Sequence, residues 1–512
     1  MSVLEREIKL AVTPDFRLPF LTDLATGVTA GREQTVELAA TYFDTFDLRI
    51  SRAGASLRYR DPEGWTVKLP ARDGDRDGDE EAIVRVEHHV QGPRPAGDGS
   101  STTPPPEALD LVRSLTRGAA VEALATLHTT RRVVALCDTA GHAIGEVVDD
   151  RVEIDSQRTE PGATVFREVE LELADDATPS QRLALLTRLR TAGAGAADPT
   201  PKIVRALGAP ARAPADVQVP RIDADEPAAA NVVRVAIATS VVRLVRNDPG
   251  ARLGDDAESL HQARVATRRL RSDLRTFEPL LDEGWAEALR DELRWLGDVF
   301  GAVRDADVLI ERFEPEIQRL PASDRPPAET VLDRLRADRE RAREQMLVAL
   351  RNERYDRLLD RLVEAASRPR LLLQVDDTDD RARLTALVRE PVRALLDAAD
   401  ALGPKPRNAA LHQVRRRAKR VRYAAEAVAP ALGRPARRLA RIATEIQDVL
   451  GVHQDAVIAA EWLRRVAAND GAGIGFAAGQ LAALEHREAR RARRRWPKTW
   501  QRTHQKQLRT WL

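Results

Sequence analysis

Cysteine is nearly absent from this chain, since Cys137 is the only one among 512 residues. An intramolecular disulfide and a zinc site built from cysteines are therefore excluded. No stretch approaches 18 consecutive apolar residues, which argues against a membrane-spanning helix. The first residues contain two acids and no apolar run, so we expect no secretion signal and a cytoplasmic protein.

Aromatic residues are also scarce, at 4% of the chain. Proteins that bind single-stranded nucleic acids usually stack the bases on aromatic side chains. The scarcity therefore argues against nucleic acid as the partner, although binding of a duplex through its phosphates alone stays open. The formal net charge of +1 predicts no partner by itself.

The small net charge hides two regions of opposite character. Residues 1–215 carry 26 basic and 34 acidic side chains, whereas residues 216–512 carry 55 and 46. The sign changes within residues 208–220, where three prolines among small residues are typical of a linker. We therefore expect a first domain at 1–207, a linker at 208–221 and a second domain at 222–512.

The first region alternates between apolar and polar residues with a period of two, as β-strands do. We expect short helices at 183–190 and 203–207, and a disordered loop at 94–106. The alternation predicts an eight-stranded antiparallel sheet or closed barrel with strands near 2–10, 35–44, 54–60, 65–70, 81–90, 127–137, 142–155 and 164–173.

Several of these strands carry charges on one face. A solvated sheet face explains one such strand, but acids and bases on separate strands favour a barrel lumen with an acidic side and a basic side. Carboxylates bind divalent cations, and arginine and lysine bind phosphate oxygens, so such a lumen suits a linear polyphosphate. The alternating charges are Glu5, Glu7 and Lys9; Arg58 and Arg60; Arg85 and Glu87; and Glu168, Glu170 and Glu172.

In this order along the chain, the charges resemble the signature of the CYTH family, also called triphosphate tunnel metalloenzymes. The resemblance covers about 200 residues. It rests on Glu5-x-Glu7-x-Lys9, Leu57-Arg58-Tyr59-Arg60, Thr66-Val67-Lys68, Arg85, Arg131-Arg132, Asp149-Asp150, Glu168-x-Glu170-x-Glu172 and Lys202.

The resemblance implies an eight-stranded tunnel that processes triphosphates with a divalent metal, Mg²⁺ or Mn²⁺. It implies a catalytic role for Glu5, Glu7, Lys9, Glu168 and Glu170. It implies metal ligands at Glu5, Glu7, Asp149, Glu168, Glu170 and Glu172. It implies phosphate binding by Lys9, Arg58, Arg60, Lys68, Arg85, Arg131 and Lys202. Strand parity leaves two choices open: Glu146 competes with Asp149, and Arg132 with Arg131.

The second region reads as helical throughout and contains an internal repeat. The segment from His261 to Arg271 recurs at 412–422, an offset of 151. The segment from Gly297 to Asp305 recurs at 447–455, an offset of 150. We therefore expect two helical bundles, at about 222–370 and 380–512.

Each copy places its basic residues within an arc of about 80° on one helix face. A solvated face explains one such helix, but its repetition with a histidine at each start favours two ridges that bind an extended polyanion. A metal site is disfavoured because neither motif has a second ligand at suitable spacing. The residues are His261, Arg264, Arg268, Arg271 and Arg275 in the first copy, and His412, Arg415, Lys419 and Arg422 in the second.

Both copies resemble the CHAD family, the conserved-histidine α-helical domain, over about 290 residues. The resemblance implies that these basic faces, with Arg304, bind inorganic polyphosphate without catalysis. Gln454 departs from the pattern, because it stands where the first copy has Arg304.

The whole chain is thus expected to hydrolyse triphosphate or short polyphosphate in a tunnel and to bind polyphosphate on its helices. Two alternatives stay open: a non-catalytic protein that binds polyphosphate and is targeted to polyphosphate granules, or a nucleotide cyclase built on the tunnel fold. No membrane contact is expected, and no protein partner can be deduced.

Overall fold

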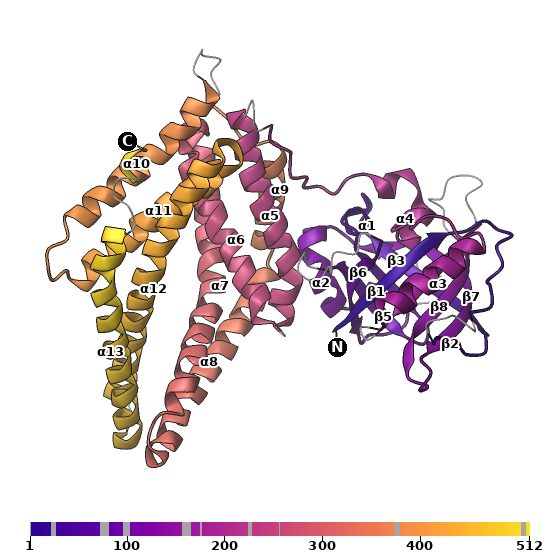
Figure 1. Ribbon diagram of the computed structural model, residues 1–512, viewed down its shortest axis with the longest axis horizontal. Coiled ribbons are helices and arrows are strands. Elements are labelled where there is room, and N and C mark those ends of the chain that lie inside the picture. The colour runs from indigo at the N-terminus through magenta and orange to yellow at the C-terminus, as the bar shows by residue number, and fades with distance from the viewer. Residues whose placement is uncertain are drawn as a thin grey trace. The chain divides into compact units, whose positions relative to one another are not determined.

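The computed structural model describes residues 2–21, 27–71, 81–95, 103–155, 165–174, 177–223, 228–254, 256–372, 379–469, 471–502 and 508–511 (Figure 1). The chain divides into two compact units, Met1–Asp216 and Val217–Leu512. The predicted linker, 208–221, straddles this division. Within the described residues no helix combines the length and apolarity needed to cross a membrane.

The first unit is a closed antiparallel barrel, as predicted. The strands follow the order β7-β3-β4-β5-β6-β1-β9-β8, and β8 pairs back onto β7 to close the sheet. A short strand, β2 (Thr29–Ala30), pairs in antiparallel fashion with the C-terminal end of β7. The eight barrel strands are β1 (Ser2–Ala11), β3 (Gln34–Asp44), β4 (Ser56–Arg60), β5 (Gly64–Pro70), β6 (Ile83–Val90), β7 (Glu122–Cys137), β8 (Ala143–Asp155) and β9 (Val165–Leu173).

The alternation along the strands separates a charged lumen from an apolar outer face. On β1, Ile8 and Leu10 point outward into a core that includes Leu171 of β9. Helix α3 (Pro179–Thr191) covers this face with Leu185 and Leu189, both fully buried. Thr178 caps the N-terminus of the helix, and its side chain forms a capping box with Gln181.

A second helix, α4 (Lys202–Leu207), packs on another part of the barrel. Its Ile203 and Leu207 join a core with Leu127 of β7 and Val152 of β8. This packing fixes the start of α4 at the lumen, so Lys202 is held there by the apolar residues that follow it.

Helices α1 (Arg49–Arg52) and α2 (Pro106–Thr116) were not expected from the sequence pattern. Proline at the first position of α2 suits a helix start, because its missing N–H would lack a partner there anyway. Most of the predicted loop at 94–106 lies outside the described residues.

The second unit is helical, as predicted, and its helices correspond in order across an offset of about 150 residues. Helices α5 to α8 are followed by α9, and α10 to α13 then begin at positions that correspond to the starts of α5 to α8 (Figure 1). The bounds are α5 (Ala229–Leu253), α6 (Ala257–Thr276), α7 (Glu283–Ile317), α8 (Arg325–Leu350), α9 (Glu353–Ser367), α10 (Asp380–Asp400), α11 (Asn408–Leu432), α12 (Arg434–Asn469) and α13 (Ala472–Arg502).

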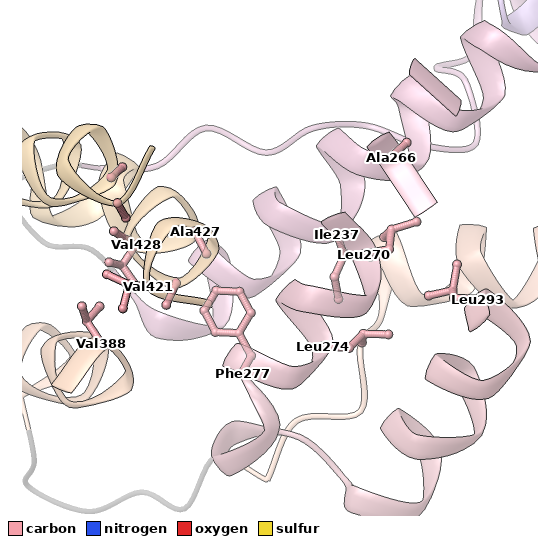
Figure 2. Close-up of a cluster of buried hydrophobic side chains, with 14 of the residues drawn as sticks. Ile237, Ala266, Leu270, Leu274, Phe277, Leu293, Val388, Val421, Ala427 and Val428 are labelled. Carbon is pink, nitrogen blue, oxygen red and sulfur yellow. The ribbon is translucent and has the colours of Figure 1, made fainter. Parts of the chain in front are cut away.

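One apolar core joins the two sets of helices. Leu270 and Leu274 of α6 are buried, as is Val421 of α11. Figure 2 shows Phe277, directly after α6, pointing toward Val421 and Ala427 of α11. The apolar stripes thus pack α6 against α11, which brings the neighbouring basic faces of the two helices together.

Candidate functional site

The lumen of the barrel contains a cavity of about 330 Å³ whose walls are mostly charged. Side chains from most of the barrel strands and from the start of α4 contribute to it. The predicted residues that line it are Glu5, Glu7, Lys9, Arg58, Arg60, Lys68, Arg85, Arg131, Glu170, Glu172 and Lys202.

Three carboxylates on one wall, Glu5, Glu7 and Glu172, form what we call the carboxylate trio. Each offers an oxygen within 4.8 Å of the others, which is close enough to hold one metal ion. Glu7 is 3% exposed, and among the described residues no donor forms a hydrogen bond with its Oε1, although Lys9 and Arg85 lie 3.5 Å from it. Oxygen ligands of this kind are those that Mg²⁺ and Mn²⁺ prefer, so the residues fit a divalent cation.

The electrostatics of the trio also favour a cation. Burial and the charges of Glu170, Glu5 and Glu7 raise the pKa of Glu172 to about 7. Burial also raises the pKa of Glu7, even though Lys9 opposes the shift. A bound divalent ion would stabilise the ionised forms of Glu7 and Glu172, which burial and the neighbouring carboxylates disfavour.

A second set of carboxylates is already neutralised by lysine and arginine. Glu170 lies 2.5 Å from Lys9 Nζ and 2.8 Å from Lys202 Nζ, and these cations hold its pKa well below the ordinary value against the effect of burial. Arg131 donates to both oxygens of Asp150, at 3.0 and 2.7 Å. We call this set the inner ion cluster; it comprises Asp150, Glu168, Glu170, Lys9, Arg131 and Lys202.

Glu168 belongs to the inner ion cluster but does not line the cavity. Its side chain is fully buried, 3.1 Å from Lys202 Nζ and 3.5 Å from Lys9 Nζ. The structure therefore places Glu168 and Glu170, which are paired with lysines, in the inner ion cluster and not in the carboxylate trio.

The remaining cations that line the cavity are Arg58, Arg60, Lys68 and Arg85. Lys68 donates to both oxygens of Glu5, at 2.6 and 2.8 Å, and Arg85 lies 3.5 Å from Glu7. Burial alone would raise the pKa of Glu5, but Lys68 and the nearby arginines lower it below the ordinary value. Among the described residues the guanidinium of Arg58 comes no closer than 3.7 Å to a lumen carboxylate. This distance is too long for a hydrogen bond, so Arg58 retains N–H groups that can bind phosphate oxygens.

The structure decides both choices that strand parity left open. Asp149 is not in the lumen: it accepts from Arg167 at 2.7 Å and from Arg132, on the outer face of the barrel. The expectation that Asp149 binds metal is therefore wrong, because adjacent strand residues point to opposite faces. Asp150 and Glu146 face the lumen instead, and Arg131 does so in place of Arg132.

In the helical unit, the basic faces of α6 and α11 meet. Arg268 of α6 donates from Nε to the hydroxyl of Tyr423 on α11, at 2.8 Å. Lys419 lies one turn before Tyr423, and the charges of Arg264 and Arg268 on α6 help to lower the pKa of its amine. We call the residues Arg264, Arg268, Arg415 and Lys419 the α6–α11 cluster.

Two glycines at equivalent positions in the repeat support this cluster. A Cβ on Gly301 would lie 3.6 Å from the guanidinium of Arg264, and one on Gly451 would lie 3.7 Å from that of Arg415. Each arginine therefore lies against the bare backbone of the next helix. Each also reaches an aspartate there: Arg264 to Asp305 at 2.9 Å, and Arg415 to its counterpart in the second copy at 3.8 Å.

The other predicted basic residues adjoin the cluster or face elsewhere. Arg304 pairs with Glu311 at 2.8 Å, and Arg422 with Glu426 at 2.8 Å. Arg271 lies against Gly297 of α7, whereas Arg275 is exposed. Burial lowers the pKa of both His261 and His412, and neighbouring arginines add to the shift.

Comparison with known proteins agrees with the two domain types expected from the sequence. A CYTH domain matches residues 4–201, and a CHAD domain matches residues 235–464. The uncharacterized protein Rv2226 of Mycobacterium tuberculosis (strain ATCC 25618 / H37Rv) is 32% identical over 519 residues, which cover 96% of this chain and 94% of the relative. This chain is a CYTH–CHAD protein. The order of its domains is the one expected from the sequence.

Solved structures resemble parts of this CYTH–CHAD protein. PptA from Streptomyces chartreusis is 27% identical, with a TM-score of 0.45, over 53% of this chain and 98% of that chain. The CHAD domain from the plant Ricinus communis is 26% identical, with a TM-score of 0.44, over 53% and 90%. A putative adenylate cyclase from Bacillus halodurans is 16% identical, with a TM-score of 0.26, over 40% and 99%.

The CYTH tunnel also contains residues that the sequence interpretation missed. Tyr42 lines the cavity, and although burial would raise the pKa of its phenol, Arg58 and Lys202 lower it. Tyr42 lies opposite Arg58 in the pairing of β3 with β4, so the expected lumen position of Arg58 could have predicted that Tyr42 also faces the lumen. The other missed lining residues include Glu63 and His89, whereas Glu87, one of the alternating charges in the sequence, lines the cavity as expected.

Proposed function

We propose that the CYTH tunnel hydrolyses inorganic triphosphate or short-chain polyphosphate with Mg²⁺ or Mn²⁺. The observation that carries this proposal is that the carboxylate trio and a set of lysines and arginines line one cavity. Phosphoryl transfer depends mainly on positioning and charge neutralisation and needs no protein nucleophile, which suits a lumen of this composition.

The residues divide the task between them. Glu5, Glu7 and Glu172 would hold the divalent metal, which supplies neutralisation of the phosphate charge when bound. Arg58, Arg60, Lys68 and Arg85 would bind the phosphate oxygens. The inner ion cluster keeps Lys9, Lys202 and Arg131 in fixed positions through their carboxylates, so these cations need little reorganisation when an anion enters.

The deciding experiment is phosphate release from tripolyphosphate by the full-length chain, with and without Mg²⁺ or Mn²⁺. The variant E5Q/E7Q should lose the metal-dependent release. Glu153→Gln is the matched control, because Glu153 lies on β8 with its side chain 58% exposed. Absence of release by folded wild-type protein with either metal would overturn the proposal and favour a non-catalytic anion-binding tunnel.

The same assay separates the cyclase alternative. ATP and Mn²⁺ should yield free phosphate or diphosphate without a cyclic product if the tunnel is a hydrolase. The same phosphate-binding residues could serve both reactions, so the product has to distinguish them. A cyclic nucleotide as the main product would contradict the hydrolytic assignment.

We further propose that the CHAD domain binds inorganic polyphosphate through the α6–α11 cluster and associates with polyphosphate granules. The supporting observation is that four cations from two helices converge, and that the aspartates beside them, Asp305 and Asp455, have solvent-accessible side chains. A chain of phosphates presents regularly spaced negative charges that can match such a row.

A further inference from the structure

One lysine of the α6–α11 cluster differs from the tunnel lysines in its surroundings. Lys419 is half-buried, and the part of the chain that the structure describes contains no carboxylate in ion-pair contact with it. Asp455, an acid whose charge acts on Lys419, pairs with Arg415 at 3.8 Å. The hydrogen bond from Arg268 to Tyr423, one turn further along α11, places Lys419 on the side facing α6.

The neighbouring charges change the protonation of this amine. Burial, Arg415 and Arg268 together lower the pKa of Lys419 to about 8. At pH 8 about half of its amine would be neutral, against about 0.3% for a lysine with the ordinary pKa of 10.5. A neutral amine is the nucleophilic form, so the surroundings favour reaction at this nitrogen.

The lysines in the tunnel have the opposite surroundings. Lys9 and Lys202 contact buried carboxylates at 2.5–2.8 Å, and these raise their pKa above the ordinary value despite burial. Lys68 donates to Glu5 at 2.6 Å. With their pKa values raised in this way, the ammonium groups of Lys9 and Lys202 stay protonated and do not attack electrophiles.

We propose that Lys419 is a modification site that reacts with acyl phosphates, whose phosphate group is bound by Arg264, Arg268 and Arg415. The neutral Nζ attacks the acyl carbon, and a C–N amide bond forms. The bond between that carbon and the phosphate oxygen breaks, inorganic phosphate leaves with the electron pair, and the amine gives up its proton to phosphate or water.

The product removes one positive charge from the cluster, since an amide is neutral. Acylation would therefore weaken the attraction of this surface for any polyanion. The reaction itself goes beyond the proposed function and does not depend on it, because it requires only the amine and the three guanidinium groups.

The test treats the full-length chain with acetyl phosphate at pH 8 and follows each lysine by mass spectrometry. Lys419 should be acetylated at least about tenfold faster than the exposed Lys405, in line with its larger neutral fraction. Arg415→Gln should slow acetylation of Lys419 several-fold. Arg416→Gln is the matched control, because Arg416 is exposed on the same helix, and it should leave the rate unchanged.

Two results would overturn the proposal. One is equal acetylation of Lys419 and Lys405 in wild-type protein whose circular dichroism shows it folded. The other concerns the ratio of the Lys419 rate to the Lys405 rate. Docking of the phosphate should make this ratio larger with acetyl phosphate than with acetic anhydride, which carries no phosphate, so the same ratio with both reagents would contradict the proposal.

Long-chain polyphosphate in the same reaction distinguishes this proposal from the proposed function. Protection of Lys419, but not Lys405, would support both the reaction site and polyphosphate binding by the cluster. Rapid acetylation of Lys419 without protection would support the modification site and contradict polyphosphate binding there.

Discussion

The CYTH tunnel and the α6–α11 cluster of the CHAD domain both gather cations, but they compensate the charges differently. Lys9 has three carboxylates within 3.5 Å, whereas Lys419 has arginines as its main neighbours. A fully buried charge is tolerated only with a partner, while a half-buried one can rely on water. The tunnel is therefore preorganised by internal ion pairs, and the cluster holds a repulsion that an external anion would relieve.

The largest expected effect comes from removing the metal. Chelation should reduce phosphate release from tripolyphosphate at least about 100-fold, because the carboxylate trio would then repel the substrate. Polyphosphate affinity of the CHAD cluster should stay within about twofold, because no carboxylate trio is involved there. Phosphate release assays and a binding titration in EDTA measure both quantities. Unchanged hydrolysis in EDTA would contradict the metal assignment.

Removal of one lysine should destabilise the tunnel and stabilise the cluster. Lys9→Met removes the one cation that contacts Glu7, Glu168 and Glu170 together among the described residues, and breaking such a buried pair costs about 3–5 kcal/mol in free energy of unfolding. Lys419→Met removes the cost of burying an ammonium group together with its repulsion by neighbouring arginines, and should stabilise its domain by about 1–3 kcal/mol at pH 7. Denaturant unfolding followed by circular dichroism measures both. Destabilisation by both variants would break the comparison.

The stabilisation by Lys419→Met should depend on pH. The pKa of Lys419 in the folded protein, about 8, lies below the ordinary value of 10.5, so the unfolded chain binds the extra proton between these values. The repulsion therefore acts in full below pH 8 and fades as the pH rises toward 10.5. Thermal melts of wild type and variant should converge over this window, and a constant difference would contradict the assignment.

Neighbouring residues of β7 sharpen the description of the tunnel. Arg131→Gln should lower kcat/KM for tripolyphosphate about 10- to 100-fold, because its guanidinium faces the lumen and holds Asp150. Arg132→Gln removes the same charge on the outer face and should change kcat/KM less than about threefold. Steady-state kinetics decide this, and equal losses would show that structural disruption, not position in the lumen, causes the effect.

The smallest effect concerns polyphosphate binding. The double variant R264Q/R415Q should weaken binding about tenfold and reduce the slope of log affinity against log salt by about two, one for each lost phosphate contact. Arg416→Gln is again the control for a lost charge on α11. Titrations at several salt concentrations provide the slope, and an unchanged slope would rule out phosphate contacts by these two arginines.

Local sequence patterns were sufficient for most of the fold. All eight barrel strands were predicted within a few residues except the start of β7, which lies at Glu122 and not near 127. Strand alternation depends only on neighbouring residues, which explains this agreement. Helix α2 was missed because its apolar positions follow a run of prolines, where the interpretation favoured a loop.

The sequence by itself determined the two domain types, the charged lumen and the repeated basic faces, because these depend on residue order and local period. Tertiary structure alone decided that Asp150 and not Asp149 faces the lumen, and that Lys9 and Lys202 neutralise Glu170 while Glu172 is left for a metal. It also decided that the two basic faces form one cluster. These outcomes depend on distances between side chains far apart in the chain, which no local pattern contains.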